Sequence, residues 1–332
     1  MSHLTNPLAT TEQLLLRASL STVPQDLQES VFVATQCLTQ AAGKLLRAPP
    51  AVTAQANVLL ARYWLVDSPM AAEFSVRCVA LRVTRLVLLL LLTGRAQDVS
   101  AAVTYLVGKI GPKPRSPRDV ANVYGYLLAP GSALFRSGEP PEDDPKSYYQ
   151  SETDYLAFSN RIMALEARIL YALSFDTHVA LPHPLAITYL QTLDFFSRPR
   201  SEASSRVVQY LNTALLSPQM LYLTHQPHAL AVAAIYNAAR DLGAKTPESE
   251  WWEVFDVDRE ELGFLVVAMR SLEAWLRQRK EELPVFRERM LTRRDVEEEM
   301  RKRGLPAANG DGEADEEAEI MRRMDARQPG FT

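Results

Sequence analysis

Residues able to perform acid–base, nucleophilic or metal chemistry are few in this sequence and poorly spaced for it. His225 and His228 lie three residues apart, but the sequence places no third ligand beside them, which favours surface or capping roles over a metal site. Cys37 and Cys78 form neither a disulfide framework nor a zinc site of the usual ligand number. The sequence contains no glycine-rich phosphate loop and no recognisable catalytic triad. We therefore predict no catalytic residue, no metal and no cofactor.

Two charged residues, Lys109 and Glu166, have ordinary explanations by residue type and position alone. Lys109 ends an expected helix, where its charge suits the negative end of the helix macrodipole. Glu166 lies inside another expected helix and has no lysine or arginine three or four residues away. Ordinary solvated side chains would explain both residues.

The elements that position these residues are helices, because apolar residues recur at three- and four-residue steps along most of the chain. No sustained alternating run indicates a sheet, so the sequence predicts an all-α protein. One expected helix carries a complete apolar face, made by Tyr155, Phe158, Ile162, Leu165, Ile169 and Leu173. This face must be buried against the rest of the protein.

The helices fall into two groups of five. Ser116-Pro117 and Thr246-Pro247 are typical helix starts. The first group is expected near residues 31–47, 51–65, 98–109, 117–129 and 154–173. The second group is expected near residues 184–196, 203–216, 227–241, 248–254 and 258–278. The join at residues 181–184 is too short for a flexible linker, so the two groups should pack together.

Other segments have compositions unlike those of the helices. Residues 129–151 are rich in proline, glycine and acids, which predicts a surface loop. After about residue 279 the chain becomes densely charged, as expected for a solvated helix that extends along the second group or a partner. From about residue 306 the composition predicts disorder, and we expect residues beyond Leu305 to be dispensable for function.

Overall composition excludes several classes of protein. A length of 332 residues predicts two domains or lobes, and the net charge of −4 argues against a general nucleic-acid-binding surface. The first residues lack the basic and apolar stretches of a secretion signal. The apolar run Leu86–Leu92 is much shorter than the roughly 20 residues of a membrane-spanning helix.

Several ordered segments of the chain resemble the cyclin family, and within it cyclins of the L type. In the first half these are residues 41–47 with Pro50, residues 105–110, residues 114–123 and residues 165–176. In the second half they are residues 178–193, residues 226–240, Trp252 and Phe255. The resemblance covers roughly residues 29–280 and implies two tandem five-helix cyclin boxes. Its implied divisions are an arm at 1–28, boxes at 29–178 and 179–280, and a charged tail at 281–332.

The resemblance also implies a function. In cyclins, a lysine on the third helix and a glutamate on the fifth face a cyclin-dependent kinase, and the matching residues here are Lys109 and Glu166. This role requires that both residues are exposed on neighbouring helices. A regulatory subunit of this kind, not an enzyme itself, stabilises the active kinase conformation. Similarity to cyclin L implies a nuclear role in transcription and pre-mRNA splicing, with a PITSLRE-type or other transcriptional kinase as partner. Splicing or transcription factors are further possible partners, whereas a membrane or a specific nucleic-acid sequence is not expected.

The chain departs from the family pattern directly after Lys109. An acidic motif usually follows there, but this chain has Gly111-Pro112-Lys113. The arginine–serine-rich tail common in cyclin L is also missing from this sequence. Two alternatives therefore stay open, both without a kinase partner: a cyclin-fold scaffold, and a general transcription factor of the B type. The second ranks lower, since the sequence shows neither a zinc ribbon nor a basic second lobe.

Residues 76–97 lengthen the segment before the third helix beyond its usual length in cyclins. Cyclins run directly from the equivalent of Ser75 into the third helix, which here would start at Asp98. The intervening residues have no clean amphipathic period, and their codons permit a splice donor, a branch point and an acceptor in frame. We interpret the segment as an insertion or a retained intron, which sequencing of the mature transcript distinguishes.

Overall fold

The computed structural model describes residues 4–19, 23–67, 96–129, 148, 150–193, 200–244, 249–288 and 290–305. All regular secondary structure in these ranges is helical, which confirms the predicted all-α fold. Residues 76–95 of the suspected insertion, most of the loop at 129–151, and the tail from residue 306 lie outside these ranges. So do Cys78 and the run Leu86–Leu92. The predicted domain boundaries stay a prediction.

The first group of helices follows the expected order. Its members are α2 (Gln25–Leu45), α3 (Pro50–Val66), α6 (Ala96–Ile110), α7 (Pro117–Leu128) and α8 (Glu152–Ala172). Helix α2 begins six residues earlier than predicted, because Pro24 accepts hydrogen bonds from the first turn and Leu27 is buried. Helix α6 begins at Ala96, so the last two residues of the suspected insertion belong to it.

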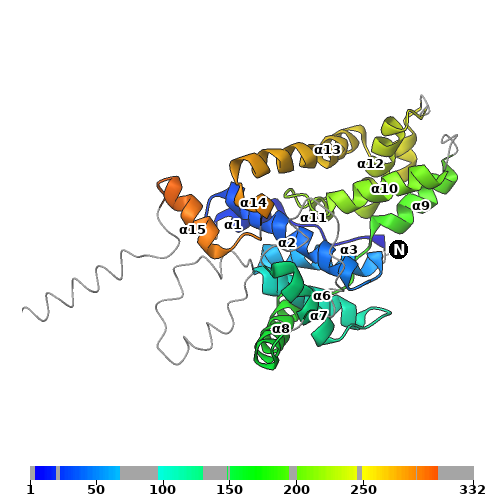
Figure 1. The fold of residues 1–332 in the computed structure, drawn as a ribbon. Helices are drawn as coiled ribbons and strands as arrows, with labels where there is room; N and C mark the ends of the chain where they lie inside the picture. The colour runs from blue at the N-terminus through cyan, green and yellow to red at the C-terminus, as the bar shows by residue number, and fades with distance from the viewer. Residues whose placement is uncertain are drawn as a thin grey trace, which may run out of the picture.

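The second group also follows the expected order. Its members are α9 (Pro182–Thr192), α10 (Arg200–Ala214), α12 (Pro227–Asp241), the 3₁₀ helix η4 (Trp251–Phe255) and α13 (Arg259–Glu282). Within the described ranges, four further helices lie outside the two predicted groups: α1 (Thr11–Ser19), α11 (Leu221–Thr224), α14 (Val285–Glu288) and α15 (Arg293–Lys302). In Figure 1 the second group lies above α2 and α3, and α6, α7 and α8 lie below them. A single cluster of buried residues runs through both groups.

Helix α6 is the most enclosed element of the first group. It packs against α2, α3, α7 and α8, and its residues are buried on nearly every side up to Gly108. Polar side chains inside this core form hydrogen bonds with one another. The Tyr124 hydroxyl lies 2.7 Å from Ser100 Oγ and 3.0 Å from Thr104 Oγ1. Ser100 Oγ in turn lies 2.7 Å from Thr39 Oγ1. Burial raises the pKa of Tyr124 to about 12, so its hydroxyl stays neutral at physiological pH.

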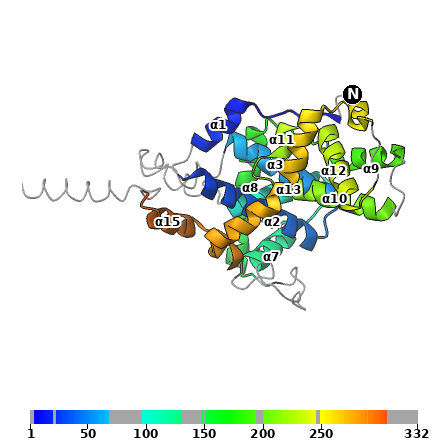
Figure 2. The same cartoon turned by 90° about the horizontal axis from the view of Figure 1, so that it is seen from above.

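The N-terminal arm joins the two groups. Asn6 is buried, its side-chain amide donates to Ala180 O at 2.8 Å, and its Oδ1 accepts from Ala180 N at 2.8 Å. The backbone of Asn6 exchanges two hydrogen bonds with the side chain of Gln226, at 3.1 and 3.0 Å. Arg62 of α3 reaches the same place and donates to His178 O at 2.8 Å. The arm therefore connects α3, the join between the groups and the start of α12. In Figure 2 the arm is the dark blue trace between the end marked N and α1.

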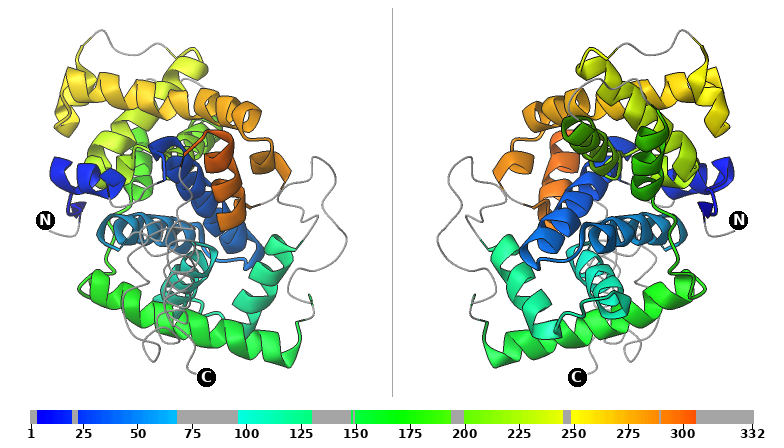
Figure 3. Two further views of the ribbon diagram at one scale, coloured as in Figure 1. Left: turned by 90° about the vertical axis from the view of Figure 1, so that its left-hand side faces the viewer. Right: turned by 90° about the vertical axis from the view of Figure 1, so that its right-hand side faces the viewer.

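The charged C-terminal segment does not extend along the second group as predicted. Helix α13 ends at Glu282, because Pro284 follows, and α15 turns back beside α2 (Figure 3). Arg303 donates to Asp26 of α2 at 2.8 Å, and Arg279 donates to the same carboxylate at 3.0 Å. Apolar contacts accompany these ion pairs, since Met290, Val296 and Met300 are buried. This segment is part of the folded body.

None of the helices in the described part of the chain is long and apolar enough to cross a membrane.

We expect Tyr124→Phe to destabilise the protein, because Ser100 and Thr104 would lose a shared hydrogen-bond partner in a buried place. The free energy of unfolding should fall by about 1–3 kcal/mol, measured by urea denaturation. Tyr210→Phe is the control: its hydroxyl bonds Asp241 at the surface, where water can replace the contact. Equal losses in the two variants would contradict the importance of the buried network.

Truncation should separate the C-terminal helix from the residues after it. A chain that ends at Leu305 should unfold at the same urea concentration as the full chain. A chain that ends at Glu288 loses the buried side chains of Met290, Val296 and Met300. Burial of such a side chain contributes about 1.5–3 kcal/mol, so the shorter chain should be destabilised by several kcal/mol. Similar stability of the two truncated chains would show that α15 does not stabilise the fold.

Candidate functional site

The structure brings Lys109 and Glu166 together from different helices. Lys109 lies in the last turn of α6, and its Nζ forms an ion pair with Oε1 of Glu166 in the middle of α8. The sequence showed no partner for Glu166 within its own helix. The partner is supplied by the packing of α6 against α8.

The exposure of the pair differs from the expectation. The side chain of Lys109 is 49% exposed, whereas that of Glu166 is only 11% exposed. The expectation that both residues are exposed is therefore wrong for Glu166, because its side of α8 turns toward α6. The buried carboxylate instead holds the lysine in place. A half-exposed ammonium group with three N–H donors has capacity left for acceptors such as the carbonyl oxygens of a partner.

Two further features of α6 lie next to the Lys109 side chain. Its Nζ lies 5.4 Å from the centroid of the Tyr105 ring, one helical turn earlier, which is a cation–π distance. The carbonyl end of α6 adds the negative end of the helix dipole. The lysine thus has a fixed position at the surface, which a freely solvated lysine would not have.

Apolar residues on the outer face of α8 extend this surface. Leu156, Met163 and Tyr171 follow one another at steps of seven and eight residues, so they share one side of the helix, and each is at least half exposed. The ring of Tyr171 packs edge-on against Phe175, with the ring centroids 5.5 Å apart. Ile110, directly after Lys109, is also exposed.

Sequence reasoning missed this stripe. The predicted inner face of α8 is confirmed, because Phe158, Ile162, Leu165, Ile169 and Leu173 are buried and Tyr155 is partly buried. The signal for a second surface was present in the sequence, since Leu156, Met163 and Tyr171 lie off that inner face. A solvated helix needs no second apolar stripe, and such a stripe is typical of a partner interface.

His225 has an ordinary packing role. The Nδ1 atom of His225 lies 2.9 Å from Thr224 Oγ1, and its ring stacks on Phe264. Burial lowers the pKa of His225, which favours its neutral form. Among the described residues, no group of three histidine, cysteine, aspartate or glutamate side chains is arranged to hold a metal ion.

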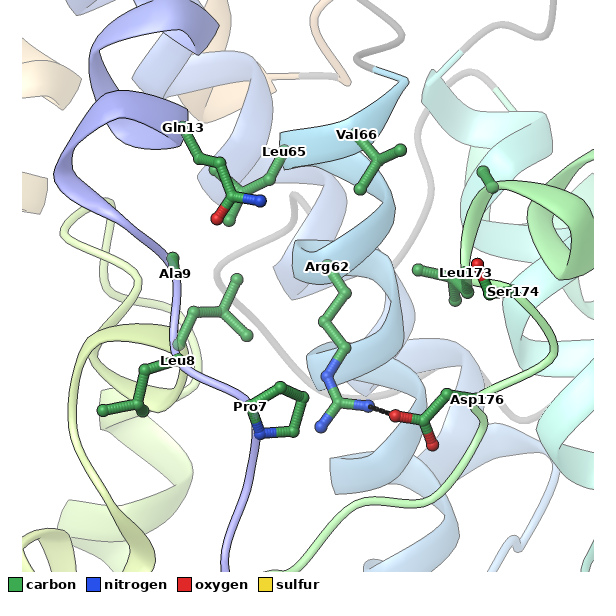
Figure 4. Close-up of a pocket in the computed structure, with 12 residues that line it drawn as sticks. Pro7, Leu8, Ala9, Gln13, Arg62, Leu65, Val66, Leu173, Ser174 and Asp176 are labelled. Carbon is green, nitrogen blue, oxygen red and sulfur yellow. Dashed lines mark ion pairs between the residues drawn. The ribbon is translucent and has the colours of Figure 1, made fainter.

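A pocket of about 370 Å³ lies between the N-terminal arm and α3 (Figure 4). Arg62 and Asp176 line it, with Arg62 Nη1 3.7 Å from Asp176 Oδ2, and apolar side chains such as Leu65 and Leu173 form other walls. Burial lowers the pKa of Arg62, and the carboxylate of Asp176 opposes that shift. Arg62 is already engaged with the join between the helix groups, so we assign the pocket a structural role.

Comparison with known proteins identifies cyclins as relatives. The chain is 29% identical to human cyclin-L2 over 242 residues, which cover 71% of this chain and 39% of the relative. It is 32% identical to an uncharacterized cyclin-L1-like protein of Schizosaccharomyces pombe over 181 residues, which cover 53% of this chain and 66% of the relative. Chicken (Gallus gallus) cyclin-L1 is 30% identical over 240 residues, covering 70% of this chain and 38% of the relative. The matched region is thus about two fifths of the length of the vertebrate relatives.

Solved structures show the same fold. A chain of the yeast RNA polymerase II CTD kinase complex CTDK-1 superposes with a TM-score of 0.57 at 14% identity, covering 87% of this chain and 86% of that one. A chain of the CAK complex of Chaetomium thermophilum gives a TM-score of 0.50 at 16% identity, covering 92% and 81%. No protein-family model matches the sequence. From the order of the helices, the fold and these relatives, we conclude that the chain belongs to the cyclin family, whose members are regulatory subunits of kinases and not enzymes themselves.

Proposed function

We propose that the chain binds and activates a cyclin-dependent serine/threonine kinase through the surface formed by Lys109, Glu166 and the apolar stripe of α8. The observation that carries the proposal is the ion pair between Lys109 and Glu166, which holds the half-exposed side chain of Lys109 against α8, the helix that carries the exposed apolar stripe. A mixed surface of this kind suits a partner helix that offers backbone carbonyls at its end and apolar side chains along its length.

Activation follows from binding one conformation of the kinase better than another. A kinase is active when a mobile helix brings its glutamate to the catalytic lysine. A subunit that contacts this helix only in its inward position shifts the conformational equilibrium by its difference in affinity for the two states. A difference of about 5.5 kcal/mol is enough to convert a mostly inactive kinase into a mostly active one. The rigid attachment of Lys109 to the core of the first helix group suits this role.

The relatives support a proposal for the cellular role. Cyclins of the L type are the named homologues, and the fold neighbours come from an RNA polymerase II CTD kinase complex and the CAK complex. We infer a nuclear protein that acts in transcription and pre-mRNA splicing with a PITSLRE-type or other transcriptional kinase, and splicing or transcription factors as further possible partners.

A scaffold without a kinase is the second candidate. The connector after Lys109 favours it, because Lys113 stands where the family has acidic residues, and it is exposed. Purification of the chain from its own cells followed by mass spectrometry separates the two candidates. Co-purification of a cyclin-dependent kinase supports the first, whereas other proteins in its absence support the second.

Exchange of the two charges should weaken kinase binding. The double variant Lys109→Glu with Glu166→Lys retains one positive and one negative charge at the pair but exchanges their positions. We expect affinity for the kinase to fall at least tenfold, about 1.4 kcal/mol, in a calorimetric titration. The control exchanges the exposed pair Arg277 and Glu273 on α13, which should leave the affinity unchanged. Normal kinase activation by the first variant, with circular dichroism showing a folded protein, would contradict the proposed contact.

A carboxylate in the apolar stripe should also weaken binding. Met163 is 51% exposed, so Met163→Glu should change the free energy of unfolding by less than about 0.5 kcal/mol. Its affinity for the kinase should fall at least tenfold, since the interface would have to bury a charge. Val254→Glu in the second group is the matched control, because Val254 is also an exposed apolar residue. Equal affinities of the two variants for the kinase would show that the apolar stripe is not part of the interface.

A further inference from the structure

A serine followed by proline lies in the connector between α6 and α7. Ser116 is exposed, and its backbone is extended, with φ −71° and ψ 150°. Residues 114–116 before α7 have no regular secondary structure. From the sequence and this geometry we propose that Ser116 is a phosphorylation site for a proline-directed serine/threonine kinase.

The flanking residues suit such a kinase. Pro117 has no backbone N–H, so its burial in a substrate groove leaves no unpaired donor, a property that proline-directed kinases use for selection. Lys113, Arg115 and Arg118 surround the serine with positive charge. Lys113 and Arg118 are exposed, and Arg115 is partly exposed. The acceptor therefore lies in a cationic and accessible segment of the folded chain.

Few contacts oppose entry of the serine into an active site. Ser116 caps α7: its Oγ accepts from Asp119 N at 3.0 Å, and its carbonyl oxygen accepts from Val120 N at 3.2 Å. The first bond is a side-chain cap, which water can replace, and the second is the first backbone bond of the helix. Because Val120 is buried, entry of Ser116 into an active site costs this one backbone bond at the start of α7.

The reaction is an ordinary phosphoryl transfer from ATP. Ser116 Oγ attacks the γ-phosphorus, the new P–O bond forms, and the bond to the β–γ bridging oxygen breaks to release ADP. The hydroxyl proton passes to the catalytic carboxylate of the proline-directed kinase. The resulting dianion would lie at the N-terminus of α7, where the amide groups of the first turn attract it.

Neighbouring charges would mostly favour the phosphate. Arg115 donates to Arg47 O at 2.8 Å, and Arg118 donates to Glu152 at 2.7 Å, so each would have to exchange one contact for the phosphate. The carboxylate of Asp119 opposes the new charge. Lys113, Arg115 and Arg118 together outweigh it.

A second serine–proline pair provides an internal comparison. Ser217 precedes Pro218, but Ser217 is only 3% exposed, and its hydroxyl oxygen accepts from Gln219 N at 3.3 Å. Ser68-Pro69 and Thr246-Pro247 lie outside the described residues. The structure thus predicts that Ser116, and not Ser217, is modified in the folded protein, although both have the required proline.

The test uses the full folded chain, ATP and a purified proline-directed mitogen-activated kinase, with sites located by tandem mass spectrometry. Peptides 110–122 and 211–223 serve as the unfolded reference. We expect both peptides to be phosphorylated, and the folded chain to be phosphorylated at Ser116 but at least tenfold more slowly at Ser217. Because the kinase is added, this result does not depend on whether the chain itself binds a kinase.

Variants make the assignment specific. Ser116→Ala should abolish phosphate on that peptide, and Pro117→Ala, which retains the hydroxyl, should slow its modification at least tenfold. Ser151→Ala is the control: Ser151 caps α8 in the same way, accepting from Asp154 N at 3.1 Å, but Glu152 follows it instead of proline. This variant should leave the rate at Ser116 unchanged. An unmodified Ser116 in the folded chain or in its peptide, or a Pro117→Ala rate equal to that of the original chain, would overturn the proposal.

Discussion

Enclosure of helix α6 by α2, α3, α7 and α8 is the constraint on which the proposed surface depends. A helix buried on nearly all sides must satisfy its polar side chains internally, and Ser100 and Thr104 do so through Tyr124. Of the residues of α6, only Lys109 and Ile110 in the last turn are exposed. The position of the lysine is therefore fixed by the packing of the entire first helix group, and not by local interactions alone.

Both ends of the described chain reinforce this arrangement. The N-terminal arm uses Asn6 to connect the join between the groups with the start of α12. The C-terminal helix α15 connects the second group back to α2, where the carboxylate of Asp26 accepts hydrogen bonds from Arg279 and Arg303. These contacts link residues more than 170 positions apart in sequence. Their combined effect is to hold the two helix groups as neighbours, as the short join between them requires.

The relationship to cyclins explains the fold but leaves parts of this chain distinctive. Lys109 and Glu166, the two residues that the resemblance assigns to kinase contact, form an ion pair, whereas the connector that follows is cationic and carries Ser116-Pro117. Charges on such a connector influence which partner surfaces are tolerated, because like charges across an interface are repulsive. The same segment that departs from the family is thus the one most suited to adjust partner choice.

The sequence by itself determined the helices and the inner face of α8, because apolar residues at three- and four-residue steps and proline helix starts are local signals. Its resemblance to cyclins also selected Lys109 and Glu166. Tertiary structure alone decided that these residues form an ion pair with Glu166 buried, since their partners come from different helices. It likewise decided that Asn6 and α15 dock on the body, and that Ser116 is accessible while Ser217 is not. These features depend on contacts between distant segments, which no local pattern of residue types encodes.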